Sequence, residues 1–175
     1  EFAARMKKFD IIPEYSFVLG TPAPTPVEVE AQIDFEIDFI KKIKRINPGT
    51  EIVLYTYSPV ATEGSDLYNQ ALEKGFKFPQ KLEDWISPAW ENFDMRKNPL
   101  TPWLTPAMID KIKNFETVLN GYYPTVTDIR LNSFKRKTIH LLSGIRYKIN
   151  IHKYPYEIKL LQRIWKYRQP EIQGF

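Results

Sequence analysis

A strand, a long capped helix and a second strand follow one another early in the chain, and this order constrains the fold most. Residues 14–20 (EYSFVLG) and 51–57 (EIVLYTY) are short segments rich in β-branched and aromatic side chains, typical of buried strands. The helix between them begins with Thr25 as its N-cap and Pro26 in its first turn, and an Asn-Pro-Gly sequence at residues 47–49 ends it. Because such a connection pairs its strands in parallel, we expect a βαβ unit.

The two strands predict a larger sheet, because parallel strands need cover on both faces and partners at both edges. We therefore expect the chain to be the end of a barrel or open sheet whose earlier strands precede it. Beyond the βαβ part, which we assign to residues 1–80, an aromatic-rich capping segment and a helix occupy residues 81–125. A basic, mostly helical C-terminal region occupies residues 126–175. Three of the four tryptophans fall in the capping segment, where we expect them to cap a core rather than to form a substrate lid.

The composition excludes several kinds of site. The chain has no cysteine, which removes disulfides, thiolate metal sites and cysteine nucleophiles from these residues and fits a reducing cytoplasm. His140 and His152 have no second ligand at metal-binding spacing, so we assign no metal ligand and no catalytic residue in this chain. No apolar run reaches the roughly 18 residues of a spanning helix.

Positive charge is concentrated in the C-terminal region. Eleven Lys or Arg residues lie between Arg130 and Arg168, with Glu157 as the one acid among them, whereas the whole chain carries a net charge of +4. This region has three interpretations. In the first, the region binds an anionic membrane surface or a pyrophosphate-bearing substrate. In the second, it binds nucleic acid, which we do not expect, because only its interleaved basic and aromatic residues support it. In the third, it is a helical face that packs on other parts of the same polypeptide.

Several segments occur in an order that resembles a known family. They are residues 13–22 (PEYSFVLGTP), the capped helix to residues 46–48 (INP), residues 55–60 (YTYSPV), then Gly64, Gly75, Phe78, Pro79 and Trp85. The order and spacing resemble the fifth and sixth barrel strands of radical SAM proteins, in the subgroup that carries a cobalamin-binding domain upstream. The resemblance covers roughly residues 6–120 and rests on the order of the segments, because each alone is common.

The resemblance implies an α/β fold: the C-terminal fragment of a partial (β/α)6 TIM-like barrel, followed by a mostly helical C-terminal region. It implies an enzyme that reductively cleaves S-adenosylmethionine with a 4Fe-4S cluster, in a cobalamin-dependent methyltransferase or cyclase-type reaction on an unactivated carbon. The three-cysteine loop that binds the cluster in this family is absent here. We therefore expect the upstream half of the same polypeptide to supply the cluster ligands and any cobalamin domain, and the fragment alone to be inactive.

In barrels of parallel strands, ligands bind at the carboxyl ends of the strands. By resemblance, the adenine and ribose of S-adenosylmethionine would contact Leu19, Gly20, Thr21, Pro22, Tyr55, Tyr57, Ser58 and Pro59. Gly20 would permit close approach of its backbone to a flat ring, although it also suits a tight turn with no ligand. Tyr55 and Tyr57 alternate with Thr56, and the sequence leaves open which side meets the helices. The substrate would be a small or lipid-like molecule.

Two other functions remain open at this point. The charge cluster is also consistent with a non-catalytic basic module that binds a membrane surface or nucleic acid. The βαβ geometry is also shared by unrelated barrel enzymes, since a fold does not fix a function.

Overall fold

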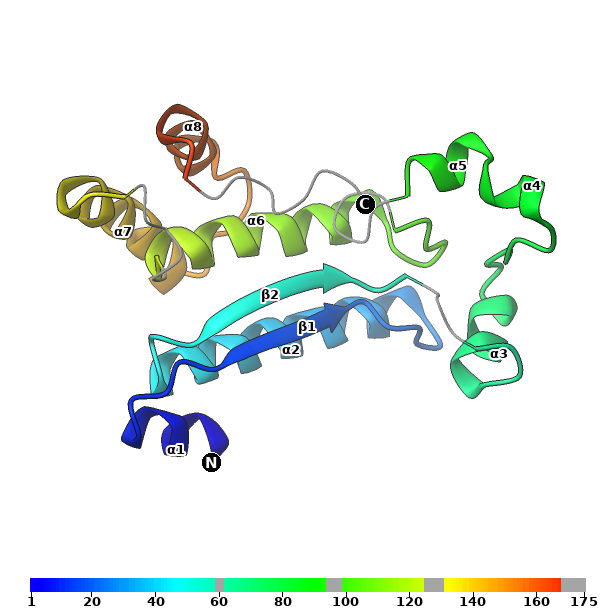
Figure 1. Ribbon diagram of the computed structural model, residues 1–175, viewed down its shortest axis with the longest axis horizontal. Helices are drawn as coiled ribbons and strands as arrows, with labels where there is room; N and C mark the ends of the chain where they lie inside the picture. Colours follow the sequence, from blue (N-terminus) through cyan, green and yellow to red (C-terminus); the bar gives the residue numbers. More distant parts are fainter. Residues whose placement is uncertain (59–61, 94–98, 125–130, 168–175) are drawn as a thin grey trace. The chain divides into compact units, whose positions relative to one another are not determined.

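Helices and two strands make up most of residues 1–58, 62–93, 99–124 and 131–167, the parts that the structure, a computed structural model, describes (Figure 1). The chain divides into two units. The strand unit comprises Glu14–Lys42 and Ile52–Ile112, and the helical unit comprises Glu1–Pro13, Ile43–Glu51 and Lys113–Phe175. Among the described residues, no helix is long and apolar enough to cross a membrane.

Strands β1 (Glu14–Leu19) and β2 (Glu51–Thr56) form a two-stranded parallel sheet. The amide of Glu51 donates to the carbonyl of Pro13 (2.9 Å), and the amide of Tyr57 donates to that of Leu19 (2.7 Å). The sequence separation is the same in both pairs, so the strands run in one direction. The predicted parallel βαβ unit is confirmed. The described strands do not close into a barrel, and the barrel stays a prediction.

Helix α2 (Pro26–Ile46) connects the two strands and begins as its sequence predicts. The amide of Thr25 donates to a carboxylate oxygen of Glu28 (2.9 Å), and the amide of Glu28 donates to the Thr25 hydroxyl (3.3 Å). This reciprocal pair is a capping box, which satisfies two amides at the helix start. Apolar residues at helical spacing form a buried stripe along α2: Val29, Ile33, Ile37, Ile40 and Ile43.

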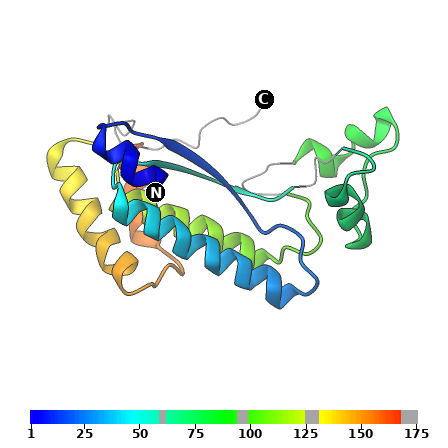
Figure 2. The same cartoon turned by 90° about the horizontal axis from the view of Figure 1, so that it is seen from below.

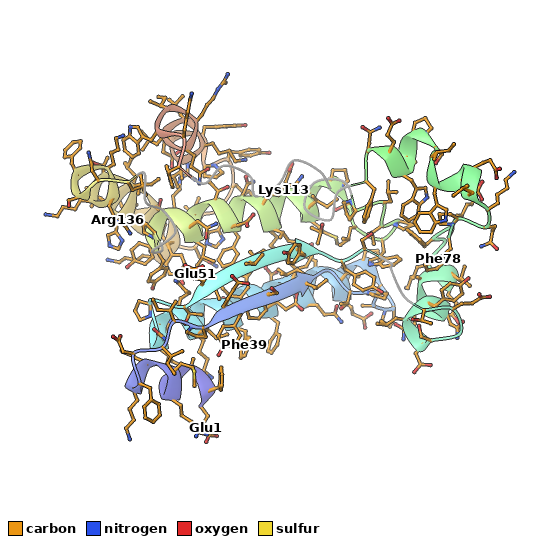
Figure 3. The ribbon with its side chains drawn as sticks, in the orientation of Figure 1. Glu1, Phe39, Glu51, Phe78, Lys113 and Arg136 are labelled. Carbon is orange, nitrogen blue, oxygen red and sulfur yellow. The ribbon has the colours of Figure 1, made fainter. Side chains whose placement is uncertain are left out.

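The two faces of the sheet differ in burial. On β2, Leu54 and Thr56 are both 2% exposed, whereas Tyr55 is half-buried. Helix α2 lies along one face of the strands (Figure 2), and Phe17 of β1 contacts Phe39 of α2 with ring centroids 6.2 Å apart (Figure 3). Since side chains alternate along a strand, Thr56 points toward the helix and Tyr55 points to the opposite, open face. Val18 of β1, 46% exposed, shares that open face with Tyr55.

The strand unit continues with α3 (Asp66–Glu73), α4 (Leu82–Trp85), α5 (Pro88–Glu91) and the first turns of α6 (Pro106–Tyr122). Ser65 accepts a hydrogen bond from the amide of Tyr68 and caps α3. The aromatic-rich capping segment contains the single-turn helices α4 and α5. Lys111 of α6 binds Glu30 (3.1 Å) and Asp34 (2.7 Å) of α2, which joins the two helices.

The helical unit contains α1 (Phe2–Lys8), the end of α6, α7 (Ser133–Lys148) and α8 (Tyr156–Trp165). Small residues allow α6 and α7 to approach closely: a Cβ added to Gly121 would lie 2.1 Å from the hydroxyl of Ser143. Lys44 is buried at the end of α2, where its ammonium donates to the carbonyls of Pro48 (2.6 Å) and Thr50 (2.7 Å). A cation in this position satisfies carbonyls beyond a helix C-terminus.

Glu36 of α2 gives a prediction for the pH dependence of stability. Burial raises the pKa of Glu36 from its ordinary value of 4.5 to about 7. Between these values the folded chain keeps a proton that the unfolded chain releases, so stability falls as pH rises through this window. Because Gln cannot ionise, we expect Glu36→Gln to remove this fall and to raise stability by about 1 kcal/mol above pH 7, a value reduced for solvent screening.

Urea unfolding of both proteins at the two ends of this pH window measures the effect. A gain that is the same at both ends would show that Glu36 does not ionise in the window.

Candidate functional site

The two segments predicted to hold the adenosyl group lie side by side at the carboxyl ends of the strands. Leu19 and Tyr57 are joined by the backbone hydrogen bond between the strands, and both side chains are buried. Ser58 is buried as well, whereas Thr21, Pro22 and Tyr55 are half-buried. Pro59 lies outside the described residues. The structure thus brings the described members of the predicted site to one edge of the sheet.

Residues 99–104 cover this edge through hydrogen bonds. The indole nitrogen of Trp103 donates to the carbonyl of Gly20 (3.0 Å), and the hydroxyl of Thr101 donates to the carbonyl of Tyr57 (2.6 Å). The hydroxyl of Ser58 donates in turn to the carbonyl of Pro99 (2.8 Å). The rings of Tyr57 and Trp103 also pack together, with centroids 5.8 Å apart. The chain itself therefore satisfies the backbone carbonyls that follow both strands.

Gly20 has the positive φ of 82° that favours glycine. A Cβ at this position would lie 2.5 Å from Cδ2 of Leu104, whose side chain is buried. The close approach that Gly20 permits is thus made by Leu104. Contact between Gly20 and an adenosyl group stays a prediction.

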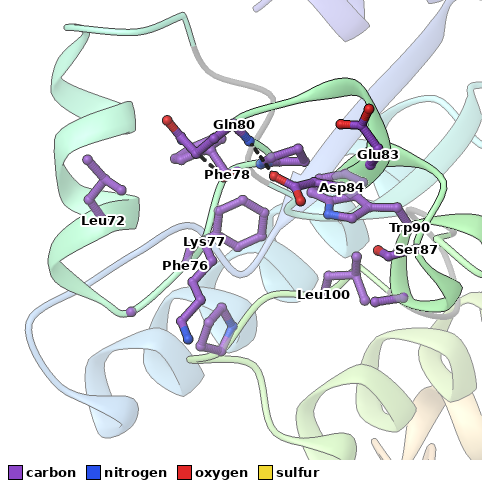
Figure 4. A pocket seen from close by; sticks show the side chains of 14 residues that line it. Leu72, Phe76, Lys77, Phe78, Gln80, Glu83, Asp84, Ser87, Trp90 and Leu100 are labelled. Carbon is purple, nitrogen blue, oxygen red and sulfur yellow. Dashed lines mark hydrogen bonds between the residues drawn. The ribbon is translucent and has the colours of Figure 1, made fainter.

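A pocket of about 780 Å³ lies beside the covered edge (Figure 4). Leu100 and Pro102 line it, and both belong to residues 99–104. This segment is therefore a shared wall, with hydrogen bonds to the strand ends and side chains in the pocket. Leu100 has a φ of 56°, which is rare for a bulky residue and is found where the surrounding structure enforces it.

Packed aromatic rings form much of the pocket. Phe78 stacks on Tyr68 with centroids 4.3 Å apart and meets the edge of Phe76 at 4.7 Å. Trp90 packs against Phe76 (6.0 Å) and Trp85 (4.8 Å). Because each ring is held by its neighbours, the walls are flat, apolar and fixed in orientation. These walls suit the apolar part of a ligand.

Two carboxylates stand at one side of the pocket. Asp84 accepts hydrogen bonds from the amides of Gln80 (2.9 Å) and Lys81 (3.3 Å), which fixes its orientation (Figure 4). Glu83 beside it is exposed. The pocket can hold an apolar molecule and offer hydrogen-bond acceptors to a hydroxyl or amine. Ser87 is the one hydroxyl side chain among the lining residues, and no histidine lines the pocket to act as its base.

Sequence reasoning identified the tryptophans of this region as a cap but did not identify a pocket. The signal in the sequence was the series of aromatic residues from Phe76 to Trp90, which lie close together without the spacing of one helix.

Within the described parts of the chain, no group of three or more His, Asp or Glu residues could hold a metal ion.

In its described part, the basic C-terminal region contains a half-buried ion pair between α7 and α8. The guanidinium of Arg146 binds Glu157, with Nη2 3.0 Å from Oε2, and also donates to the carbonyls of Lys153 and Tyr154. Burial raises the pKa of Glu157, but the hydrogen bonds from Arg146 outweigh it and hold the pKa below its ordinary value. Arg130 and Arg168 lie outside the described residues.

Comparisons with family models, with curated proteins and with solved structures found no match to this chain.

Proposed function

We propose that this chain forms the last two strands and the C-terminal helical region of a radical SAM enzyme of the cobalamin-binding subgroup, built on a partial (β/α)6 TIM-like barrel. The observation that supports this most is the parallel pairing of β1 and β2, which brings the turns after Leu19 and Thr56 to one edge. Barrel enzymes bind their ligands at this edge. The open face of the sheet, with Val18 46% exposed, would form part of the barrel interior.

The strand-end residues fit an adenosyl group in part. Leu104 fills the space beside Gly20, and the side chains of Leu19, Tyr57 and Ser58 are buried. Thr21, Pro22 and Tyr55 remain accessible, and Val18 presents an apolar surface on the same face as Tyr55. In the proposal, these four residues hold the adenosyl group, with the apolar surface against the adenine ring. S-adenosylmethionine and its iron–sulfur cluster supply radical chemistry at an unactivated carbon.

The aromatic pocket holds the substrate in this proposal. Its apolar walls suit the small or lipid-like substrate expected from the resemblance, and its carboxylates would orient a polar group. Residues 99–104 separate the pocket from the strand ends, so a shift of this segment would connect them. The protein's part in catalysis is to orient the substrate and to exclude water.

The test uses the longest natural polypeptide that contains this chain, because the chain has no cysteine and the proposal requires the cluster ligands elsewhere. After anaerobic reconstitution with iron and sulfide, the reduced protein is expected to cleave S-adenosylmethionine to 5′-deoxyadenosine. Val18→Trp places a bulky ring on the open face and should lower this cleavage about tenfold or more. Leu82→Trp, at a residue 77% exposed on α4, is the control and should leave cleavage unchanged.

Trp90→Ala separates the substrate pocket from the cofactor site. It should lower turnover of substrate while leaving substrate-independent cleavage of S-adenosylmethionine intact. A parent polypeptide without a three-cysteine cluster motif would refute the proposal, and so would a loaded protein that never forms 5′-deoxyadenosine.

A further inference from the structure

Helices α7 and α8 form an antiparallel hairpin whose outer side is apolar. Arg146 near the end of α7 binds Glu157 at the start of α8. The ammonium of Lys135, at the start of α7, lies 5.7 Å from the ring centre of Trp165 at the end of α8. These two contacts mark the seam between the helices. Figure 3 shows side chains of both helices directed away from α6.

Large apolar side chains occupy the side of this hairpin opposite its buried residues. Each is more than half exposed: Phe134, Leu141, Ile145, Ile149, Tyr156, Leu160 and Ile164. On α7 they lie opposite Ile139, which is fully buried, and on α8 they lie opposite Ile158, which is also fully buried. We call these seven residues the hairpin face.

The two helical stripes of the hairpin face meet across the seam. From the spacing of 3.6 residues per turn, Ile145 and Ile149 lie on the edge of the α7 stripe nearest the seam residue Arg146. By the same geometry, Leu160 and Ile164 lie on the edge of the α8 stripe nearest Glu157. The hairpin face is therefore one continuous patch formed by both helices.

Positive charge surrounds the hairpin face. Residues 131–167 contain nine Lys or Arg and one acid, Glu157, which Arg146 binds. Lys137 and Lys148 lie on the outer edge of the α7 stripe, and Arg163 lies on the outer edge of the α8 stripe; all three are exposed. An apolar centre with a basic rim is the pattern of helices that lie in the surface of an anionic membrane.

Exposed tyrosines at one end of the hairpin add to its similarity with helices that lie in a membrane surface. Tyr154 and Tyr156 are both more than half exposed and stack with ring centroids 5.8 Å apart. Tyrosine is enriched at the boundary between lipid and water, because its ring is apolar and its hydroxyl is polar.

We infer that the hairpin face binds an anionic lipid surface. Between a second copy of the chain and an anionic membrane, charge favours the membrane: a second copy would bring the same positive rim against this one, whereas anionic headgroups complement it. The aliphatic centre decides against nucleic acid, whose phosphates would bind the bases but leave Leu141, Ile145 and Leu160 without a partner. This inference does not depend on the proposed radical chemistry.

Vesicle flotation tests the inference with the protein as it exists. Vesicles of phosphatidylcholine and phosphatidylserine, mixed at roughly three to one, should carry the protein upward, whereas pure phosphatidylcholine vesicles should carry much less. Higher salt should weaken binding to the mixed vesicles without abolishing it, since salt screens the bases but not the apolar contact.

Two sets of substitutions separate the apolar from the basic contribution. Replacing Lys137, Lys148 and Arg163 together with Gln should weaken binding to the mixed vesicles about a hundredfold. Replacing Leu141, Ile145 and Leu160 together with Gln should remove the binding that survives high salt. The matched control is Leu82→Gln, which changes a leucine that is 77% exposed outside the hairpin and should have no effect.

Hydrogen exchange on the unsubstituted protein gives a second measurement that does not depend on any variant. Mixed vesicles should protect the amides of α7 and α8.

Four results would overturn the inference: no flotation, loss of flotation in Leu82→Gln, a dimer without lipid that the apolar variant dissociates, or oligonucleotide binding that only the basic variant weakens. Failure of S-adenosylmethionine cleavage would leave this inference untouched.

Discussion

Replacement of Gly20 by valine is expected to lower the free energy of unfolding by about 4 kcal/mol, from left-handed backbone strain and from overpacking. Gly20 has a φ of 82°, a conformation that a β-branched residue adopts only with strain. The new side chain would also meet Leu104, whose Cδ2 lies 2.5 Å from an ideal Cβ position. Leu104 is buried and cannot move to solvent without losing its own packing. Urea unfolding measures the loss.

Two other glycines of the strand unit separate strain from crowding. Gly64 and Gly75 have φ values of 81° and 83°, and no atom lies within 4 Å of an added Cβ at either position. Gly64→Val and Gly75→Val should therefore show the strain alone, about 1 to 2 kcal/mol. A second substitution, Leu104→Ala in the Gly20→Val protein, should restore part of the lost stability. Equal losses at all three glycines would show that Leu104 does not crowd position 20.

The Gly20 variants also distinguish two interpretations of this residue. If Gly20 serves only the turn and the contact with Leu104, then Gly20→Ala should lower stability and leave the affinity for S-adenosylmethionine unchanged in the protein that remains folded. If the backbone of Gly20 also contacts the adenosyl group, the affinity should fall as well. Substitution of Gly20 therefore measures separately its contribution to stability and its contribution to the proposed binding of S-adenosylmethionine.

The βαβ unit could be predicted because its signals are local. The capping box of Thr25 and Glu28 joins residues within one turn, and Thr25 is the N-cap that the sequence predicts. The strand segments are short and bounded by glycine or proline, so their limits can be recognised in the sequence. Helix α6 falls within residues 81–125, where a helix is predicted, and it continues through Gly121 to Tyr122, since glycine is unfavourable inside a helix but does not prevent it.

The candidate site depends on contacts between distant residues, which one sequence does not reveal. The hydrogen bond from Trp103 to Gly20 joins residues 83 positions apart. The aromatic rings around Trp90 were predicted to cap a core, and their arrangement as a pocket wall follows from three-dimensional packing of short helices. The side of Tyr55 was also undecided, since alternation gives two faces but not which of them meets α2. The resemblance to radical SAM proteins remains a prediction, because it rests on the order of segments along the chain and not on contacts between distant residues.

Phe115→Ala, which removes a buried ring of the helical unit, is expected to lower the free energy of unfolding by about 4 kcal/mol. Phe115 of α6 is fully buried. Its ring meets the imidazole of His152, in the connection between α7 and α8, with centroids 5.1 Å apart. Removing the ring leaves a cavity between α6 and this connection, which the rigid helices cannot fill. Urea unfolding monitored by far-UV circular dichroism measures the loss.

Phe134 of α7 provides the matched control, because the same substitution there removes a ring that is 75% exposed. Phe134→Ala should change stability by less than about 0.5 kcal/mol, as surface substitutions usually do. This control also bears on the lipid inference, since Phe134 belongs to the hairpin face. A neutral effect on stability with weaker vesicle binding would show that this ring serves a contact outside the folded chain. A loss comparable to that of Phe115→Ala would instead show that Phe134 packs within the chain, and the hairpin face would not be free to meet a membrane.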